Sequence, residues 1–85
     1  MLTYTDAIAD VGLVTVTDGN ISCLIRHSQD GGKAVIWHKE TGNAPTSLSD
    51  PVSVVFCGAN NNIVCIRDFL TLGKAIAKLR RLSRA

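Results

Sequence analysis

Most of the chain alternates between short apolar, β-branched runs and brief turn-forming sequences. Five runs have the length and composition of β-strands: residues 13–17, 21–27, 33–40, 52–57 and 63–66. The sequences between them are rich in glycine, asparagine and aspartate, as in Asp18-Gly19-Asn20, which favours a tight hairpin turn. Because these connections are short, we expect the first three runs to form an antiparallel meander and the last two to form a hairpin.

The hydrophobic period changes from two to about 3.6 residues after residue 66, which predicts a helix over residues 69–83 with Asp68 as its N-cap. One broad face of this helix is apolar: Phe69, Leu72, Ala75, Ile76, Leu79 and Leu82. Four cations lie on the other side and are called the basic stripe: Lys74, Lys78, Arg81 and Arg84. The helix is therefore predicted to be amphipathic and to cover one face of the sheet.

The N-terminal segment fits a short helix over residues 3–11. Thr3 or Thr5 can cap it, and Gly12 can end it. A strand over residues 8–17 is the competing interpretation. The sequence as a whole predicts one α+β domain, with an antiparallel sheet of about five short strands and one amphipathic C-terminal helix.

Residues 41–51 form the longest connection and contain both prolines of the chain, together with serine, glycine and asparagine. Loops of this length often make functional contacts. The simpler interpretation, which we favour, is a crossover that carries the chain to another edge of the sheet.

Both faces of the predicted hairpin over residues 52–66 are apolar. A half-solvated antiparallel strand should alternate apolar and polar residues, and one helix covers only one face. Cover for the second face must come from the N-terminal segment, the long loop or another molecule. We therefore expect a homodimer or another protein partner to contact Trp37, Val55, Val64 and Ile66. For Trp37 a core position is the favoured alternative.

The net charge of +2 is unevenly distributed along the chain. Residues 1–65 carry three basic and six acidic side chains, a net charge of −3, whereas residues 66–85 carry six basic and one acidic, a net charge of +5. The basic stripe could follow the phosphates of a nucleic acid or dock on an acidic protein. It contains no aromatic residue for base stacking, so a solvated helix face is the simpler interpretation.

The residue types that bind metals or act as nucleophiles are present without a recognisable pattern: Cys23, His27, His38, Cys57 and Cys65. Their spacing lacks the close pairs of a zinc site, and the chain has no Gly-x-Ser-x-Gly elbow. The cysteines fit small buried hydrophobes. Gly31-Gly32-Lys33 is followed by alanine instead of serine or threonine, so it does not complete a phosphate loop. We expect no metal, no cofactor and no enzymatic activity.

Four functional hypotheses remain from the sequence. The preferred one is a non-enzymatic interaction module, dimeric or partner-bound, that uses an apolar sheet face and the basic helix. The alternatives are a nucleic-acid-binding protein, a small phage or mobile-element inhibitor acting by occlusion, and a small enzyme or ligand binder using His27 and His38. The chain contains neither a signal-peptide pattern nor an apolar run of the roughly 18–20 residues that span a bilayer. We therefore expect a cytoplasmic protein without membrane contact.

Overall fold

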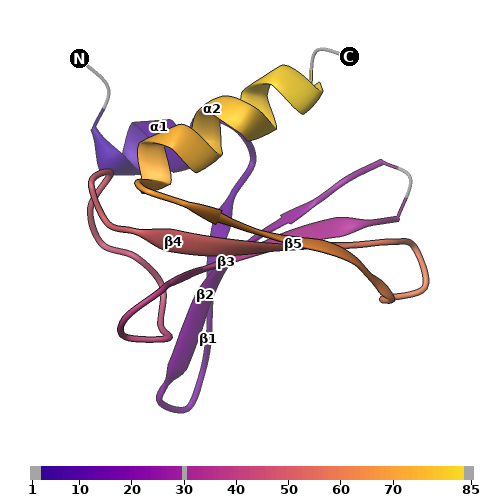
Figure 1. The fold of residues 1–85 in the computed structure, drawn as a ribbon, viewed down its shortest axis with the longest axis horizontal. Coiled ribbons are helices and arrows are strands. Elements are labelled where there is room, and N and C mark those ends of the chain that lie inside the picture. The colour runs from indigo at the N-terminus through magenta and orange to yellow at the C-terminus, as the bar shows by residue number, and fades with distance from the viewer. Residues whose placement is uncertain (1–2, 30, 84–85) are drawn as a thin grey trace.

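Both helices lie on one side of a single twisted sheet (Figure 1). The computed structural model describes residues 3–29 and 31–83, with the side chains of the last helix described as far as residue 81. The elements follow one another as α1 (Tyr4–Asp10), β1 (Val14–Asp18), β2 (Ile21–His27), β3 (Lys33–His38), β4 (Val52–Cys57), β5 (Ile63–Phe69) and α2 (Leu72–Ser83). The strands are antiparallel throughout, in the order β1-β2-β3-β4-β5. The predicted α+β fold is confirmed.

Thr3 and Gly12 set the two ends of α1. The Thr3 hydroxyl accepts a hydrogen bond from the backbone N–H of Asp6 at 3.2 Å, and Gly12 has a positive φ of 76°. Glycine adopts this left-handed conformation without the steric penalty of a Cβ atom. The predicted N-terminal helix and its threonine cap are confirmed. The competing strand over residues 8–17 is wrong in its first part, because β1 begins at Val14.

The β1–β2 hairpin has a two-residue loop, Gly19 and Asn20, between the paired residues Asp18 and Ile21. Gly19 has a φ of 62°, as the first central residue of a type II′ turn requires. The twist of such a turn matches the twist of the strands it joins, so the turn fixes the pairing register. Register in turn decides which face of the sheet each side chain occupies.

The long loop connects neighbouring strands. β3 pairs directly with β4, from Lys33 opposite Cys57 to His38 opposite Val52. The expectation that residues 41–51 carry the chain to another sheet edge is therefore wrong, and the antiparallel meander continues through all five strands.

Thr71, and not Asp68, caps α2. The backbone N–H of Lys74 donates to the Thr71 hydroxyl at 3.2 Å. Asp68 instead belongs to β5, where it pairs with Ser53 of β4 and accepts a hydrogen bond from the Ser53 hydroxyl at 2.8 Å. The predicted cap was wrong because strand pairing continues as far as Phe69, beyond the point at which the apolar period changes.

The long loop also completes the N-terminus of α2. The backbone N–H groups of Leu72 and Gly73 donate to the carbonyls of Asp50 and Leu48, at 2.8 and 2.9 Å. The first N–H groups of a helix have no partner within the helix, so these carbonyls satisfy donors that would otherwise need water. The loop thereby holds the start of α2 against the sheet.

The core lies between the two helices and the sheet. It comprises Ala7, Val11, Leu13, Leu24, Ala34, Ile36, Val52, Val54, Leu72, Ala75, Ile76 and Leu79. Strands β2, β3 and β4 contribute alternate residues to it, and α2 contributes its predicted apolar residues from Leu72 to Leu79. Phe69, also predicted for this helix face, belongs to β5 and packs against the core, and the side chain of Leu82 lies outside the described part. Among the described residues, no helix has the length and apolarity to cross a membrane.

We predict that Leu72→Ala lowers the free energy of unfolding by about 2–5 kcal/mol, because Leu72 is completely buried and its loss leaves a cavity under the start of α2. Leu70→Ala is the matched control, since Leu70 is 75% exposed two residues earlier, and we expect it to change stability by less than about 0.5 kcal/mol. Chemical denaturation of both variants measures the difference. Equal effects would show that α2 does not pack as described.

Candidate functional site

The face of the sheet that carries no helix is called the open face. α1 and α2 contact each other on the opposite face (Figure 1). The long loop also lies on the helix side, where Leu48 packs against the core and the Tyr4 hydroxyl donates to the carbonyl of Pro45 at 2.6 Å. The N-terminal segment from residue 3 onward and the long loop were the two parts of the chain that could have covered the open face, and neither lies across it (Figure 1).

A continuous row of branched aliphatic side chains crosses the open face and is called the aliphatic row. Strand register places its members opposite one another, one from each strand in turn: Val14, Ile25, Val35, Val55 and Ile66. Of these five residues, the sequence predicted Val55 and Ile66 as contact residues and did not indicate Val14, Ile25 or Val35. Period-two alternation within each strand would identify them only once the pairing between strands is known.

Exposure varies along the aliphatic row as expected for an uncovered sheet. At the two sheet edges Val14 is 55% exposed and Ile66 is 59% exposed, whereas Val55 in the middle is 9% exposed because neighbouring side chains shield it. Scattered apolar residues are normal on a protein surface, but a contiguous apolar patch commonly marks an interaction site.

A second row on the open face changes from apolar to polar across the sheet. Val16 pairs with Cys23 on the β1 side, and Trp37 pairs with Ser53, which in turn pairs with Asp68 on the β5 side. Trp37 is half-buried at the centre of the sheet. The core position favoured for Trp37 from the sequence is therefore wrong, because Trp37 lies outside the buried core.

The Asp68 carboxylate, the charged group of the second row, has partners within the chain. Lys39 Nζ lies 3.4 Å from a carboxylate oxygen of Asp68, whose other oxygen accepts the hydrogen bond from Ser53. The Ser53 hydroxyl, followed by the Lys39 ammonium group, lowers the pKa of Asp68 below its usual value. This polar group lies at one corner of the open face, beside the edge strand β5, and the paired residues His27 and Lys33 lie on the same face at the other end of their strands.

Val64 is displaced from the aliphatic row by a bulge. Phe56 pairs with Cys65, but Cys57 pairs with Ile63, which leaves Val64 as the extra residue. Val64 is 71% exposed and lines an open hollow of about 310 Å³ whose walls include Phe56 and, from α2, Leu79. We therefore separate Val64 from the other three residues predicted to form an interface.

The basic stripe is retained on the outer side of α2. Lys74 and Arg81 are exposed, Lys78 is half-buried, and Arg84 lies outside the described residues. Arg80, at the margin of the stripe, turns toward α1, where its guanidinium group contacts the Asp10 carboxylate at 2.9 and 3.1 Å. Arg80 therefore forms an ion pair between the two helices, whereas the described members of the basic stripe remain on the surface.

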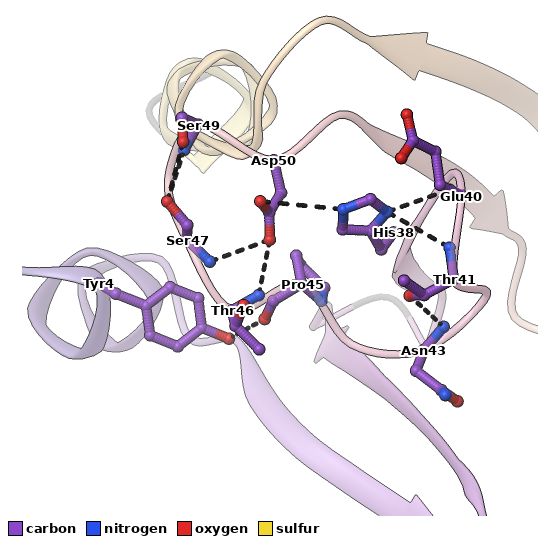
Figure 2. A network of polar contacts seen from close by, with 10 residues as sticks. All are labelled: Tyr4, His38, Glu40, Thr41, Asn43, Pro45, Thr46, Ser47, Ser49 and Asp50. Carbon is purple, nitrogen blue, oxygen red and sulfur yellow. Dashed lines mark hydrogen bonds and ion pairs between the residues drawn. The ribbon is translucent and has the colours of Figure 1, made fainter.

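His38 organises the long loop (Figure 2). Its Nδ1 accepts hydrogen bonds from the backbone N–H groups of Glu40 and Thr41, at 3.0 and 3.5 Å, and its Nε2 lies 3.8 Å from a carboxylate oxygen of Asp50. A nitrogen that accepts hydrogen bonds carries no proton, so the neutral ring holds its proton on Nε2, facing Asp50.

Asp50 is the second centre of the loop network (Figure 2). Its carboxylate accepts backbone hydrogen bonds from Thr46 and Ser47, at 2.9 and 3.1 Å. The Thr46 hydrogen bond is the main cause of a lowered pKa at Asp50, with Ser47 and the nearby imidazole of His38 contributing in the same direction. The Ser47 hydroxyl in turn is hydrogen-bonded to the hydroxyl of Ser49 at 2.9 Å.

This network resembles a nucleophilic site in composition but not in geometry. A base that activates serine needs a free imidazole nitrogen directed at the hydroxyl. Both nitrogens of His38 face other groups of the loop. His27 lies at the opposite end of the sheet, where it pairs with Lys33, so the two histidines do not converge. The network can hold the loop, and through Asp50 the start of α2, in one conformation.

The cysteines do not assemble either. Cys65 pairs with the core residue Phe56, whereas Cys57 occupies the next pair of β4, which points to the other face. Cys23 lies on the open face opposite Val16, and all three thiols are free. Within residues 3–29 and 31–83, no three histidine, cysteine, aspartate or glutamate side chains are grouped so that they could hold a metal ion.

Comparison of the chain with protein-family models, with curated proteins and with solved structures gave no match.

We predict that the stabilising effect of the Asp50 charge depends on pH. Because the folded-state pKa of Asp50 is lowered, its contribution is complete well above the ordinary aspartate pKa of about 3.9 and is lost as pH falls through the lower folded-state value. The difference in thermal midpoint between the native chain and Asp50→Asn should therefore be largest near pH 6 and shrink toward about pH 3. A difference that is constant over this range would contradict the assigned role.

Proposed function

We propose that this chain is a non-enzymatic binding module whose contact surface is the open face of its sheet. The aliphatic row is the observation that carries this proposal. In an antiparallel sheet with one solvated face, the solvated positions are normally polar. Here the five positions that cross the centre of that face are all valine or isoleucine.

The architecture suits a rigid contact surface. The other side of the sheet is fixed by the core, and every strand is paired along its length, so the open face is preformed. A preformed surface loses little conformational entropy on binding. The central apolar row has Asp68 on one side and His27 and Lys33 on the other, which matches the usual arrangement of an interface with an apolar centre and a polar rim.

Nucleic-acid binding through the basic stripe is the second candidate, and one observation favours it. Within the described part of the chain, Lys74, Lys78 and Arg81 form no ion pair or side-chain hydrogen bond, in contrast to Arg80. Three unpaired cations on one helix face are available to phosphate groups. The stripe and the open face lie on opposite sides of the molecule, so the two functions can be tested separately.

For the binding module, we predict position-dependent photo-crosslinking in cells that express the chain. Benzoylphenylalanine placed at Ile66 should give defined adducts of higher mass, because Ile66 lies at the end of the aliphatic row. The same amino acid placed at Arg67, the adjacent position on the other face of β5, which is also exposed, should give none.

The two positions lie next to each other on the same strand and carry the same crosslinking amino acid, so the comparison tests the face of the sheet. Equal adduct formation at Ile66 and Arg67, or none at Ile66, would refute the open face as the contact surface. Mass spectrometry of the Ile66 adduct identifies the partner, whether it is a second copy of the chain or another protein.

For the second candidate, we predict that affinity for a short DNA or RNA duplex falls steeply with salt and is abolished in Lys78→Glu/Arg81→Glu. Release of counterions by about three phosphate contacts gives a slope of roughly −3 in log affinity against log salt concentration. Lys33→Glu/Lys39→Glu introduces the same change in net charge away from the stripe and serves as the control. Binding that is absent, or insensitive to salt, would eliminate this candidate.

A further inference from the structure

We propose that the open face binds a second copy of this chain, through a two-fold axis that crosses the strands and lays one aliphatic row on the other. This inference rests on the proposed function and specifies its partner. It commits to sheet-on-sheet packing, in which two sheets lie about 10 Å apart with their strands nearly aligned.

The aliphatic row is self-complementary. A two-fold interface requires a surface patch that fits itself, so that each residue meets either itself or its symmetry mate. An axis parallel to the aliphatic row places Val35 on Val35 at the centre and Val14 on Val14 at one edge. All five members are branched and of similar size, which allows the two rows to interdigitate without a bulky or polar obstruction.

The charges on either side of the row select this axis over the alternative. Lys33 lies on the open face at one end of β3, and Trp37 lies at the other end. A two-fold axis running along β3 would place Lys33 on Lys33 of the second copy. An axis across the strands instead places Lys33 over the indole ring of Trp37, where a cation is attracted to the aromatic face.

The Asp68 carboxylate lies at the margin of the open face. Asp68 is hydrogen-bonded to Ser53 and paired with Lys39, and this group lies at the β5 margin of the sheet. It therefore falls on the rim of the interface, where polar groups remain in contact with water. The axis across the strands lays β5 on β5 and places Asp68 near Ile63 of the second copy, whereas the axis along β3 places it near Val16, so Asp68 does not distinguish the two axes.

The size of the face is sufficient for a specific interface. Five strands about 4.8 Å apart, each with about six residues at about 3.3 Å, span an area of roughly 480 Å² in projection. Two copies bury about 960 Å² by this measure, and projecting side chains raise the accessible area further. The total reaches the threshold of about 1,000 Å² for a specific protein–protein interface, which predicts a weak, concentration-dependent dimer.

Single-cysteine crosslinking tests both the partner and the axis. In a background carrying Cys23→Ala, Cys57→Ala and Cys65→Ala, Val14→Cys and Ile66→Cys are introduced separately, and a short bismaleimide is added. We expect each variant to crosslink to itself, and a mixture of the two to yield no mixed product above chance encounter. Thr15→Cys, the exposed neighbour of Val14 on the helix side, is the control that should not crosslink.

Sedimentation velocity over a concentration series accompanies the crosslinking. The native chain should pass from monomer to dimer as its concentration rises, and Val35→Lys should abolish the dimer. Ile66→Lys should have the same effect, and because Ile66 is exposed at the sheet edge, this substitution does not disturb folding. Circular dichroism confirms that the variants are folded.

Each outcome is decisive. If the chain is a dimer but the mixture of Val14→Cys and Ile66→Cys variants gives mainly the mixed crosslinked product, the axis across the strands is wrong and the axis along β3 is supported. A native chain that stays monomeric, while Ile66 photo-adducts contain another protein, overturns the second copy as partner and leaves the proposed function standing. A monomer without any adduct at Ile66 overturns both.

Discussion

The packing of α1 and α2 side by side on one face of the sheet is the constraint on which the other features depend. Their apolar faces meet alternate residues of the strands, so the core fixes which half of each strand points away from the helices. The exposed Arg80–Asp10 ion pair joins the helices at the surface, where such pairs contribute little free energy, so apolar packing carries most of the arrangement. Once this face is fixed, the aliphatic row has no position except the opposite surface.

The long loop supports the same constraint and explains why its polar residues need no catalytic role. Its carbonyls accept the first N–H groups of α2, while the side chains of His38 and Asp50 bind the backbone of the loop itself. Asp50 therefore serves twice, with its carbonyl at the helix start and its carboxylate within the loop. The two faces of the sheet therefore differ: one is buried beneath the helices, and the other carries the aliphatic row on the surface of the described chain.

Local sequence signals were sufficient for most elements and insufficient for their pairing. Period-two alternation within β3 separates Ala34 and Ile36, which face the helices, from Val35 and Trp37, which lie on the open face, so each strand's own pattern contains this information. The β3–β4 pairing across the long loop has no local signal, and without it the aliphatic row cannot be assembled from sequence. The loop network could not be predicted from the sequence either. Its side chains mainly accept hydrogen bonds from backbone N–H groups, and almost every residue has such a group, so the sequence does not indicate the partners.

Two errors have specific physical causes. Asp68 and Thr71 are both suitable N-caps, and the pairing of β5 with β4 through Phe69 decides between them by keeping Asp68 in the strand. The bulge removes Val64 from the regular alternation of β5, so Val64 does not join the aliphatic row. Neither the composition nor the apolar pattern of β5 indicates this bulge. Both cases show tertiary pairing overriding a local preference that was itself reasonable.

The fluorescence of Trp37 offers the most direct test that the open face is covered in solution, because it is the single tryptophan of the chain and lies at the centre of that face. If a second copy covers the face, quenching by acrylamide should be weak in concentrated protein and strengthen on dilution, with the emission maximum moving to longer wavelength. Quenching and emission that are independent of concentration, at the level of a half-exposed indole, would contradict the account.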